Sequence, residues 1–467
     1  MTDTYDIIIV GAGPAGMAAA TQASKYSDSI LILDEQTAPG GQIYRAIEAM
    51  KNRNRVELGD SYHSGLALAE KFRGRSKTEN IKYIPKASVW KVSNNNEVGF
   101  SAKGMAQTVY GKEIIIATGA LERPFPVPGW TLQGVMTIGA AQILLKESEL
   151  AIEDAIFAGC GPLFYLVIYQ YLTAGIPIKA VIDLTPKINY LKALPHLPNA
   201  LPALPKIFEG WQWKRRIIQS KVPFITGATE LEIIGKTSVT GIKYKNNSTW
   251  KELQAKHILL HQGVVPNINI SLAAGCDSNW NSRQACWNIT VDNWFQSSIK
   301  GIRVAGDGTS IGGAKAAEQR GHIAALGALT QLKKITPKER DISATPHRSV
   351  LKSEMRSRPF LDALFKPAEN FRIPKHDKTI ICRCEELTAG EIREVVKTGF
   401  DEPNKLKSFN RCGMGPCQGR FCGLTVSELI SNTLKKPVND IGYYRLRPPI
   451  KPLFLHELAN LHKASED

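Results

Sequence analysis

Five cysteines near the end of the 467-residue chain could hold a metal centre. Cys382 and Cys384 form a Cys-x-Cys pair in "TIICRCEEL", and Cys412, Cys417 and Cys422 follow in "RCGMGPCQGRFC". Thiolates at this density bind an iron–sulfur cluster or zinc. Zinc modules usually begin with a Cys-x₂₋₄-Cys pair, so the Cys-x-Cys start favours an iron–sulfur cluster. Zinc and a metal-free loop are the alternatives.

A glycine-rich loop near the start has the spacing of a dinucleotide-binding turn. It directly follows the apolar run 7–10 and consists of Gly11, Gly13 and Gly16. Such glycines allow the tight turn, the approach of a pyrophosphate and the packing of helix on strand. Glu35 ends the next apolar run and is placed to bind a ribose diol, with its neighbour Asp34 as the alternative.

Three later segments indicate that this dinucleotide is FAD, because they resemble parts of two-dinucleotide flavoproteins. They place two residue pairs and one loop beside the cofactor: Thr118 and Gly119, Gly306 and Asp307, and Gly40, Gly41, Gln42 and Arg45. The helix that begins near 312–314 would direct its positive end at the flavin ring. Residues 1–150 contain no cysteine, which excludes the dithiol chemistry of disulfide reductases.

A second strand–turn–helix–strand unit begins near residue 155 with an imperfect glycine pattern. Gly159 and Gly161 fit, but Phe164 stands at the third glycine position. Asp183 closes the following strand and could bind a ribose, and no arginine follows it to hold a 2′-phosphate. Three readings stay open here: a bound adenine nucleotide such as NAD or ATP, a working NADH site, and a purely structural domain.

These motifs predict an α/β protein with two Rossmann-type domains, like the disulfide-reductase flavoproteins, and a small helical C-terminal domain. The predicted divisions are a discontinuous FAD domain at 1–130 and 268–330, a second dinucleotide domain at 131–267, a surface linker at 331–378, a cluster domain at 379–440 and a tail at 441–467. The linker prediction rests on its prolines, its many charges and the lack of a sustained apolar period.

Charge and hydropathy favour an intracellular protein without a membrane span. The formal net charge is +16, but Lys and Arg are spread along the chain, which argues against nucleic-acid binding. The most apolar helical run, "LFYLVIYQYL", is far shorter than the about 20 residues of a membrane helix. We expect no secretory leader and a cytoplasmic location, with peripheral attachment to the inner face of the membrane as an alternative.

The cysteine pattern resembles the BFD-like [2Fe–2S] domain, in which a second cysteine pair follows Cys-x-Cys by about thirty residues. This resemblance implies four ligands: Cys382, Cys384, Cys417 and Cys422. Cys412 falls where such loops often have alanine, which makes it a spare thiol or a poised substitute for a ligand. The wider spacing between Cys417 and Cys422 departs from the BFD-like pattern.

Together, "PGGQIYR" and "CRCE…GMGPCQGRFC" resemble the α subunits of FAD-dependent amino-acid dehydrogenases. That group includes the A subunits of opine oxidases, the B subunits of hydrogen cyanide synthases and the α subunits of D-hydroxyproline or L-proline dehydrogenases. The resemblance implies an electron relay with a partner β subunit that resembles D-amino-acid oxidase. A quinone or respiratory acceptor and a small [2Fe–2S] subunit would complete the system.

Two other functions remain open at this point. One is a self-sufficient NADH-dependent reductase, and the other is a non-enzymatic redox-sensing scaffold. None of the nine histidines lies in a catalytic motif, so the sequence predicts no catalytic residue and no acid–base pair near the flavin segments.

Overall fold

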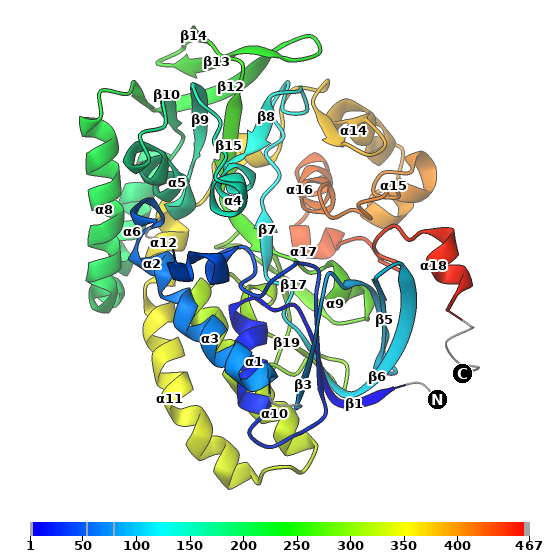
Figure 1. The fold of residues 1–467 in the computed structure, drawn as a ribbon. Coiled ribbons are helices and arrows are strands. Elements are labelled where there is room, and N and C mark those ends of the chain that lie inside the picture. Colours follow the sequence, from blue (N-terminus) through cyan, green and yellow to red (C-terminus); the bar gives the residue numbers. More distant parts are fainter. Residues whose placement is uncertain (1–2, 53–54, 78–79, 462–467) are drawn as a thin grey trace.

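The computed structural model describes residues 3–52, 55–77 and 80–461, which form two α/β domains and a C-terminal domain of short helices (Figure 1). The first sheet has the strand order β3-β2-β1-β6-β5-β4, and β19 pairs with β6. Ile7, Ile8 and Ile9 are fully buried, as expected for β-branched residues in a central parallel strand. The strands are β1 (Thr4–Val10), β2 (Ile30–Asp34), β3 (Ile81–Pro85), β4 (Ser88–Val92), β5 (Glu97–Ala102), β6 (Met105–Ile116) and β19 (Ile302–Val304).

Helices cover this sheet, and two of them come from opposite ends of the domain's sequence. The first helix packs against α10, so the chain returns to the first domain after the second is complete. The helical elements here are α1 (Pro14–Ala23), η1 (Ile47–Asn52), η2 (Val56–Leu58), α2 (Asp60–His63), α3 (Gly65–Ser76) and α10 (Ala314–Gln331), which η5 (Gly306–Gly308) precedes.

The second domain has a parallel sheet in the order β11-β10-β9-β15-β8 and a three-stranded antiparallel sheet. The strands are β8 (Val135–Thr137), β9 (Ala155–Cys160), β10 (Ile178–Asp183), β11 (Phe224–Thr226), β12 (Ala228–Gly235), β13 (Val239–Asn246), β14 (Thr249–Gln254) and β15 (Ile258–Gln262). The helices are α4 (Ile138–Ser148), α5 (Pro162–Thr173), α6 (Lys187–Ala193), η3 (Leu194–His196), α7 (Leu197–Ala200), η4 (Leu201–Ala203) and α8 (Leu204–Gln219).

A short antiparallel ribbon carries the chain between the two domains. It pairs the segment that leaves the first sheet with the segment that returns from the second. The ribbon and the elements that follow it are β7 (Ala120–Glu122), β16 (Val264–Pro266), α9 (Asn269–Ala273), β17 (Ser278–Asn281) and β18 (Cys286–Ile289).

The region 331–378, predicted as a surface linker, is largely helical. It contains α11 (Pro337–Arg356), α12 (Arg358–Leu364) and α13 (Glu369–Arg372). A capping box between Thr336 and Glu339 starts α11, which tolerates Pro346 in its interior. The helix is held by tertiary contacts, because His347 stacks on His322 at 4.2 Å and Arg340 lies 3.9 Å from the centre of the Trp294 ring.

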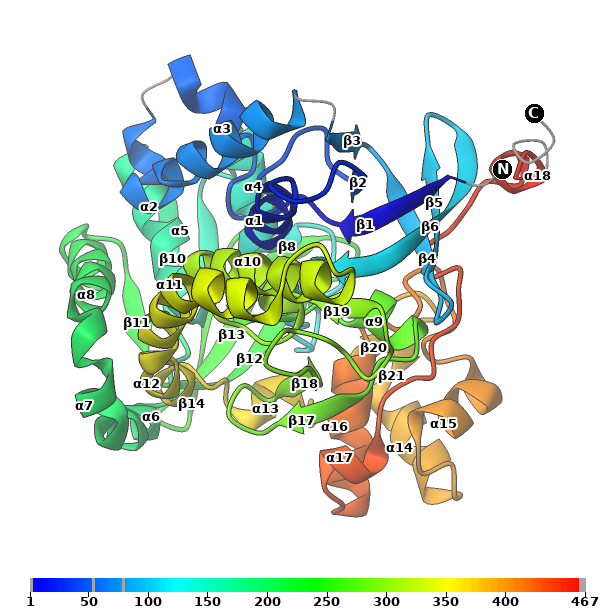
Figure 2. The ribbon, with the colours of Figure 1, turned by 90° about the horizontal axis from the view of Figure 1, so that it is seen from below.

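The C-terminal domain is a group of short helices beside the cysteine loops. Its elements are β20 (Ile380–Cys382), β21 (Leu387–Thr388), α14 (Ala389–Lys397), α15 (Pro403–Asn410), α16 (Gly423–Leu434), α17 (Val438–Ile441) and α18 (Leu455–Ala459). The predicted cap of α14 by Thr388 and Glu391 is confirmed. Figure 2 shows this domain on the side of the molecule away from α6, α7 and α8. Trp130 Nε1 donates to the Ile380 carbonyl at 2.7 Å and joins the domain to the second one.

Candidate functional site

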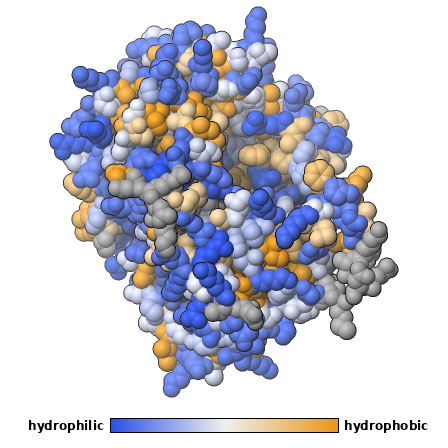
Figure 3. All heavy atoms as spheres, in the orientation of Figure 1, coloured by the Kyte–Doolittle hydropathy of each residue, from blue (hydrophilic) through white to orange (hydrophobic). Residues whose placement is uncertain are grey.

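A cavity of about 880 Å³ lies where the three domains meet. Its wall includes Gly13, Thr118 and Asp307 from the first domain, His261 from the second and Arg420 from the C-terminal domain. The space-filling view shows the surface hollowed between the second and C-terminal domains (Figure 3). Ligand pockets have volumes of roughly 300–1,000 Å³, so this cavity is large enough for a nucleotide cofactor.

Two helix N-termini open into the cavity without a side-chain cap. The helix α1 begins after Gly13, and α10 begins after Gly313. Gly13 lies against Gly41, because a Cβ atom on Gly13 would be 3.7 Å from the Gly41 Cα. Free N–H groups and a positive dipole end attract phosphate groups. This part of the cavity therefore fits the pyrophosphate of FAD.

Asp34 and Glu35 have different roles at the end of β2. Asp34 is buried, and its carboxylate accepts hydrogen bonds from the Ala12 N–H at 2.5 Å and the Gln36 N–H at 2.7 Å. It therefore holds the glycine loop in place. Glu35 lines the cavity and pairs with Lys451 at 2.8 Å. A ribose diol at Glu35 would have to share the carboxylate with Lys451, whereas at Asp34 it would have to displace an N–H group of the glycine loop.

The remaining predicted flavin residues do not all face the cavity. Those that line it are Gly11, Gly13, Glu35, Gly41, Gln42, Thr118, Gly119, Gly306 and Asp307. Asp307 is fixed at the start of α10 because its Oδ1 accepts the Gly312 N–H at 2.8 Å. Gly16 packs against the Gly11 carbonyl, where a Cβ would clash, and so serves the predicted helix–strand contact.

Arg45 and Gly40 lie behind the wall of the cavity, which corrects their predicted placement beside the cofactor. Arg45 is buried, and its guanidinium donates to Gln42 Oε1 at 2.9 Å and to Gln36. The charge of Arg45 is used within the protein. It positions Gln42, which does line the cavity.

A buried lysine supports the same loop from beneath. Lys146 is 3% exposed, and its ammonium donates to the Ile43 carbonyl at 2.8 Å and to Gln142 Oε1 at 3.0 Å. Burial, with the nearby charge of Arg45, lowers the pKa of Lys146 to about 7.

The structure contains an acid–base pair that the sequence did not predict. His261 Nδ1 donates to Glu122 Oε1 at 2.6 Å, and the second carboxylate oxygen accepts the Gly139 N–H at 2.9 Å. A carboxylate can only accept, so the proton lies on Nδ1 and Nε2 is an acceptor in the neutral ring. A Cβ on Gly161 would be 3.8 Å from Nε2, which places that nitrogen beside the second glycine loop.

The pair was missed because its members are 139 residues apart in sequence. Glu122 ends β7 in the ribbon between the domains, and His261 lies in β15. Neither residue belongs to a local motif. The sequence carried only a weak signal: a histidine inside an otherwise apolar strand that leads into a glycine turn.

The second glycine loop is built differently from the first. Gly161 lines the cavity, whereas Gly159 approaches β15 so closely that a Cβ would lie 2.0 Å from the His261 carbonyl. Phe164 is fully buried in the core and does not project into the cavity. Its ring therefore fills the space between α5 and the sheet, whereas a glycine at this position would let helix and strand pack more closely.

Asp183 is already occupied by protein groups. Its carboxylate accepts hydrogen bonds from the Tyr165 hydroxyl at 2.8 Å, the Thr185 N–H at 3.0 Å and the Lys214 ammonium at 3.1 Å. Asp183 is 2% exposed and does not line the cavity.

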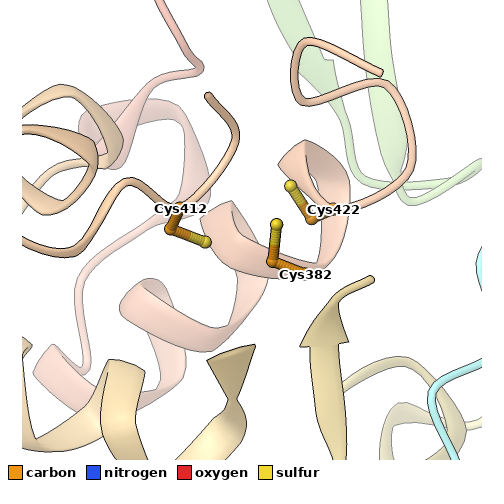
Figure 4. Close-up of side chains that lie close together, drawn as sticks. All are labelled: Cys382, Cys412 and Cys422. Carbon is orange, nitrogen blue, oxygen red and sulfur yellow. The ribbon is translucent and has the colours of Figure 1, made fainter. Parts of the chain in front are cut away.

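The structure separates the five cysteines into a group of three and a pair. The sulfur atoms of Cys382, Cys412 and Cys422 lie within 4.8 Å of one another and point toward a common centre (Figure 4). Cys384 is exposed and Cys417 is half-buried, and these two thiols contact each other.

Cys412, predicted as a spare thiol or a substitute ligand, lies within this group of three. Arg411 and Gly413 on either side of it have left-handed backbone conformations, with φ of 65° and 84°. These turns direct Cys412 into the domain core, where it is fully buried. The alanine of BFD-like loops was matched to Cys412 by its position along the sequence, and position alone does not reveal the direction of this turn.

Hydrogen bonds within the group of three favour a thiolate. Those from Cys412 and Cys422, aided by the backbone N–H groups of Gly413 and Glu385, lower the pKa of Cys382 far below its ordinary value. The Tyr444 hydroxyl donates to Cys412 Sγ at 3.3 Å. Thiolates with backbone donors around them are the ligand type that iron–sulfur clusters use, so the donor set fits such a cluster.

The cysteine loops are joined to the flavin segments. Asn269 Nδ2 donates to the Gln418 carbonyl at 3.0 Å, and Asn267, two residues earlier, accepts from the Thr118 hydroxyl at 3.1 Å. Arg420 and Phe421 line the same cavity as the first glycine loop. Segments of both predicted redox sites therefore line one cavity.

Two family models match the chain. A model described as pyridine nucleotide-disulphide oxidoreductase matches residues 5–321, and the sarcosine oxidase A3 domain matches residues 376–461. The chain is 40% identical to the A subunit of opine oxidase from Agrobacterium tumefaciens (strain Ach5), covering 99% of this chain and 92% of the relative. It is 29% identical to the HcnB subunit of hydrogen cyanide synthase from Pseudomonas aeruginosa, covering 97% and 98% of the two chains.

Solved structures share the fold. L-proline dehydrogenase from P. horikoshii has a TM-score of 0.72 at 18% identity, covering 97% of this chain and 79% of that one. T. acidophilum thioredoxin reductase has a TM-score of 0.51 at 22% identity and covers 71% of this chain and 99% of that one. These likenesses and the first family model confirm the predicted α/β flavoprotein fold. The identity to the opine oxidase relative over nearly the whole chain shows that this protein belongs to the family of opine oxidase A subunits.

Proposed function

We propose that the chain is the electron-relay subunit of a hetero-oligomeric amino-acid or opine dehydrogenase and holds FAD and a [2Fe–2S] cluster. A partner flavoprotein that resembles D-amino-acid oxidase would oxidise the C–N bond of the donor to an imine and take up two electrons. The observation that carries this proposal is the single cavity lined by both the flavin loop and the cluster loop, through Gly13 and Arg420.

The chain's own residues would hold FAD at one side of this cavity. The first helix N-terminus would bind the pyrophosphate, Glu35 the adenosine ribose, and Asp307 the region toward the flavin. The start of α10 would face the flavin ring and favour its anionic reduced form. When bound, FAD accepts two electrons at once, whereas a [2Fe–2S] cluster carries one.

The cysteine grouping supports a specific set of cluster ligands. Each iron of a [2Fe–2S] cluster takes two thiolates. We assign Cys384 and Cys417 to one iron, because their thiols are in contact. The other iron would take Cys382 and either Cys412 or Cys422, the two thiols that lie beside it. The domain that holds them would be the BFD-like domain expected from the sequence.

Asp183 argues against the alternative of a self-sufficient NADH-dependent reductase. A ribose diol at this position would have to displace the Lys214 ammonium or the Tyr165 hydroxyl from the carboxylate. The Asn189 side chain also donates to the Leu364 and Lys366 carbonyls, which holds the end of α12 over the same edge of the sheet. Breaking these contacts would cost free energy and would therefore weaken the binding of an adenosine group.

The electrons from the donor require an acceptor outside the chain. Oxidation of one C–N bond to an imine releases two electrons and two protons. A quinone would take up both electrons and both protons, and a respiratory one-electron carrier would be needed twice. A small [2Fe–2S] subunit would fit between this chain and such an acceptor.

The proposal is tested by an anaerobic absorbance titration of the flavin- and cluster-loaded chain. The chain alone should keep its oxidised flavin spectrum with NADH and with an amino acid or opine. Adding the D-amino-acid-oxidase-like partner should allow the amino acid or opine to bleach both the flavin and the cluster. Stoichiometric bleaching by NADH alone would instead support the independent reductase. Retention of both oxidised spectra with partner and donor present would exclude the relay role.

A further inference from the structure

The crossover between β10 and β11 exposes an apolar face that the rest of the described chain leaves uncovered. Nine of the 22 large apolar side chains that the described residues expose lie within residues 188–218, so this surface is concentrated in one segment. They are Ile188, Tyr190, Leu191, Leu194, Leu201, Leu204, Phe208, Trp211 and Ile218. The segment forms α6 to α8, at the edge of the second domain and away from the C-terminal domain (Figure 2).

The exposed residues of α8 follow a helical spacing. Leu204, Phe208, Trp211 and Ile218 fall three, four or seven positions apart and therefore share one face of the helix. Each of them is about half exposed. The rings of Phe208 and Trp211 stack at 5.6 Å, so the face is continuous.

The opposite face of α8 is already used within the protein. Ile217 is fully buried, and α8 packs against α5. Trp213, on this inner face, lies 6.3 Å from the Tyr169 ring. Lys214 lies at the border of the inner and the exposed face, three positions after Trp211, and bonds Asp183. The helix thus has two apolar faces, of which one packs on the domain and the other faces solvent. A helix that packed only on its own domain would need a single apolar face.

The same segment is strongly basic. Residues 187–221 contain seven Lys or Arg residues and one acidic residue, Glu209. Lys206 pairs with Glu354, and Lys214 pairs with Asp183. The others are exposed and have no ion pair among the described residues: Lys187, Lys192, Arg215, Arg216 and Lys221.

We propose that the segment 188–218 docks the protein on an anionic membrane surface. Leu, Phe and Trp on one face with Lys and Arg around them are the composition of helices that lie in the membrane interface. Unpaired cations are attracted to anionic headgroups, and tryptophan and tyrosine prefer the headgroup level. The core of a protein–protein interface is instead depleted in lysine. Across the described ranges, the helices are too short or too polar to span a bilayer, so docking would be peripheral.

This inference rests on the surface alone and does not depend on the relay role. It would place the second domain against the membrane. The C-terminal domain, on the opposite side of the molecule, would point away from the lipid (Figure 2).

The test is co-sedimentation of the flavin- and cluster-loaded chain with vesicles. One set contains phosphatidylcholine alone, and the other also contains phosphatidylglycerol. We expect binding to the anionic vesicles, weakening with added salt, and little binding to neutral ones. Absence of binding, or equal binding to both sets, would overturn the proposal.

Two variants and a control assign the binding to this segment. Changing both Arg215 and Arg216 to Ala should weaken binding about 25-fold, since each cation near the surface contributes roughly a factor of five. Trp211→Asp should reduce binding further by placing a charge in the apolar face. Trp250→Asp, at a tryptophan of β14 that is 42% exposed, should bind like the wild type.

Failure of this proposal and failure of the relay role can be told apart. Trp211→Asp should keep the flavin and cluster spectra and electron transfer with the partner in solution, because Trp211 does not line the cavity. If Trp211→Asp binds vesicles like the wild type but no longer associates with the partner flavoprotein, the face is a protein interface and membrane docking is wrong.

Discussion

Replacing Lys146 is expected to change the free energy of unfolding in opposite directions at neutral and at alkaline pH. Its pKa falls from an ordinary 10.5 to about 7 because the ammonium is buried. Between these values the unfolded chain binds a proton at Lys146 that the folded chain does not, so stability rises with pH in this window. The difference between the two pKa values corresponds to roughly 5 kcal/mol of lost stability well below pH 7 and to roughly 4 kcal/mol at pH 7. At about pH 9.5 the loss has fallen to roughly 1 kcal/mol.

Replacing Lys146 by Met removes this loss but also removes two hydrogen bonds. The carbonyl of Ile43 and the Oε1 of Gln142 each lose a donor, at roughly 1–1.5 kcal/mol per bond. Lys146→Met should therefore be more stable than the wild type by about 2 kcal/mol at pH 7 and less stable by about 1 kcal/mol near pH 9.5. For a domain of about 150–250 residues, each kcal/mol of change in the free energy of unfolding shifts Tm by roughly 2–4 °C.

Thermal unfolding of the two proteins at both pH values, followed by tryptophan fluorescence, measures this crossover. Other titrating groups are common to both proteins, so the difference in Tm isolates Lys146. Lys179→Met removes an exposed lysine of the same domain and should shift the two Tm values in parallel. If Lys146→Met also runs parallel to the wild type across the pH range, Lys146 is not buried as a largely neutral amine and the reasoning is refuted.

Four further substitutions give expected outcomes. Glu113→Ala should lower the free energy of unfolding by about 3–5 kcal/mol in chemical denaturation, because it leaves the buried Arg303, now 2.8 Å from the carboxylate, without a charged partner and with the Trp294 carbonyl as an acceptor; an unchanged midpoint would contradict this. Asp34→Ala should weaken FAD retention about tenfold or more, measured as flavin per chain after dialysis, since two loop N–H groups lose their acceptor. Of Cys412→Ser and Cys422→Ser, one should keep a normal [2Fe–2S] signal and iron content while the other loses it, and equal loss in both would exclude the proposed ligand set.

The parts of the site that the sequence predicted are the local ones. The first glycine loop, its strand and the acid that follows lie within about one strand–helix–strand unit, so spacing alone placed Gly11, Gly13 and Glu35 along the cavity. The cap of α14 was likewise readable, because Thr388 and Glu391 are three residues apart. In such cases the backbone geometry within one turn determines the contact.

The parts that could not be predicted depend on tertiary structure. Proline and charge in 331–378 argued against a helix, and the stacking of His347 on His322 helps to hold α11 in place. The direction of Cys412 depends on a left-handed Arg411. Intrinsic preferences are weak priors that such packing overrides.

The helix α8 connects the two conclusions about the second domain. At the border of its inner and outer faces, Lys214 donates to Asp183, which the sequence predicted as a ribose ligand. Its outer face supplies Trp211, which is about half exposed in the apolar surface proposed to meet the membrane. Lys214 follows Trp211 by three positions, so a change that moves α8 would alter both. Without Lys214, the Asp183 carboxylate would still accept from the Tyr165 hydroxyl and the Thr185 N–H, and a ribose would still have to displace one of these donors.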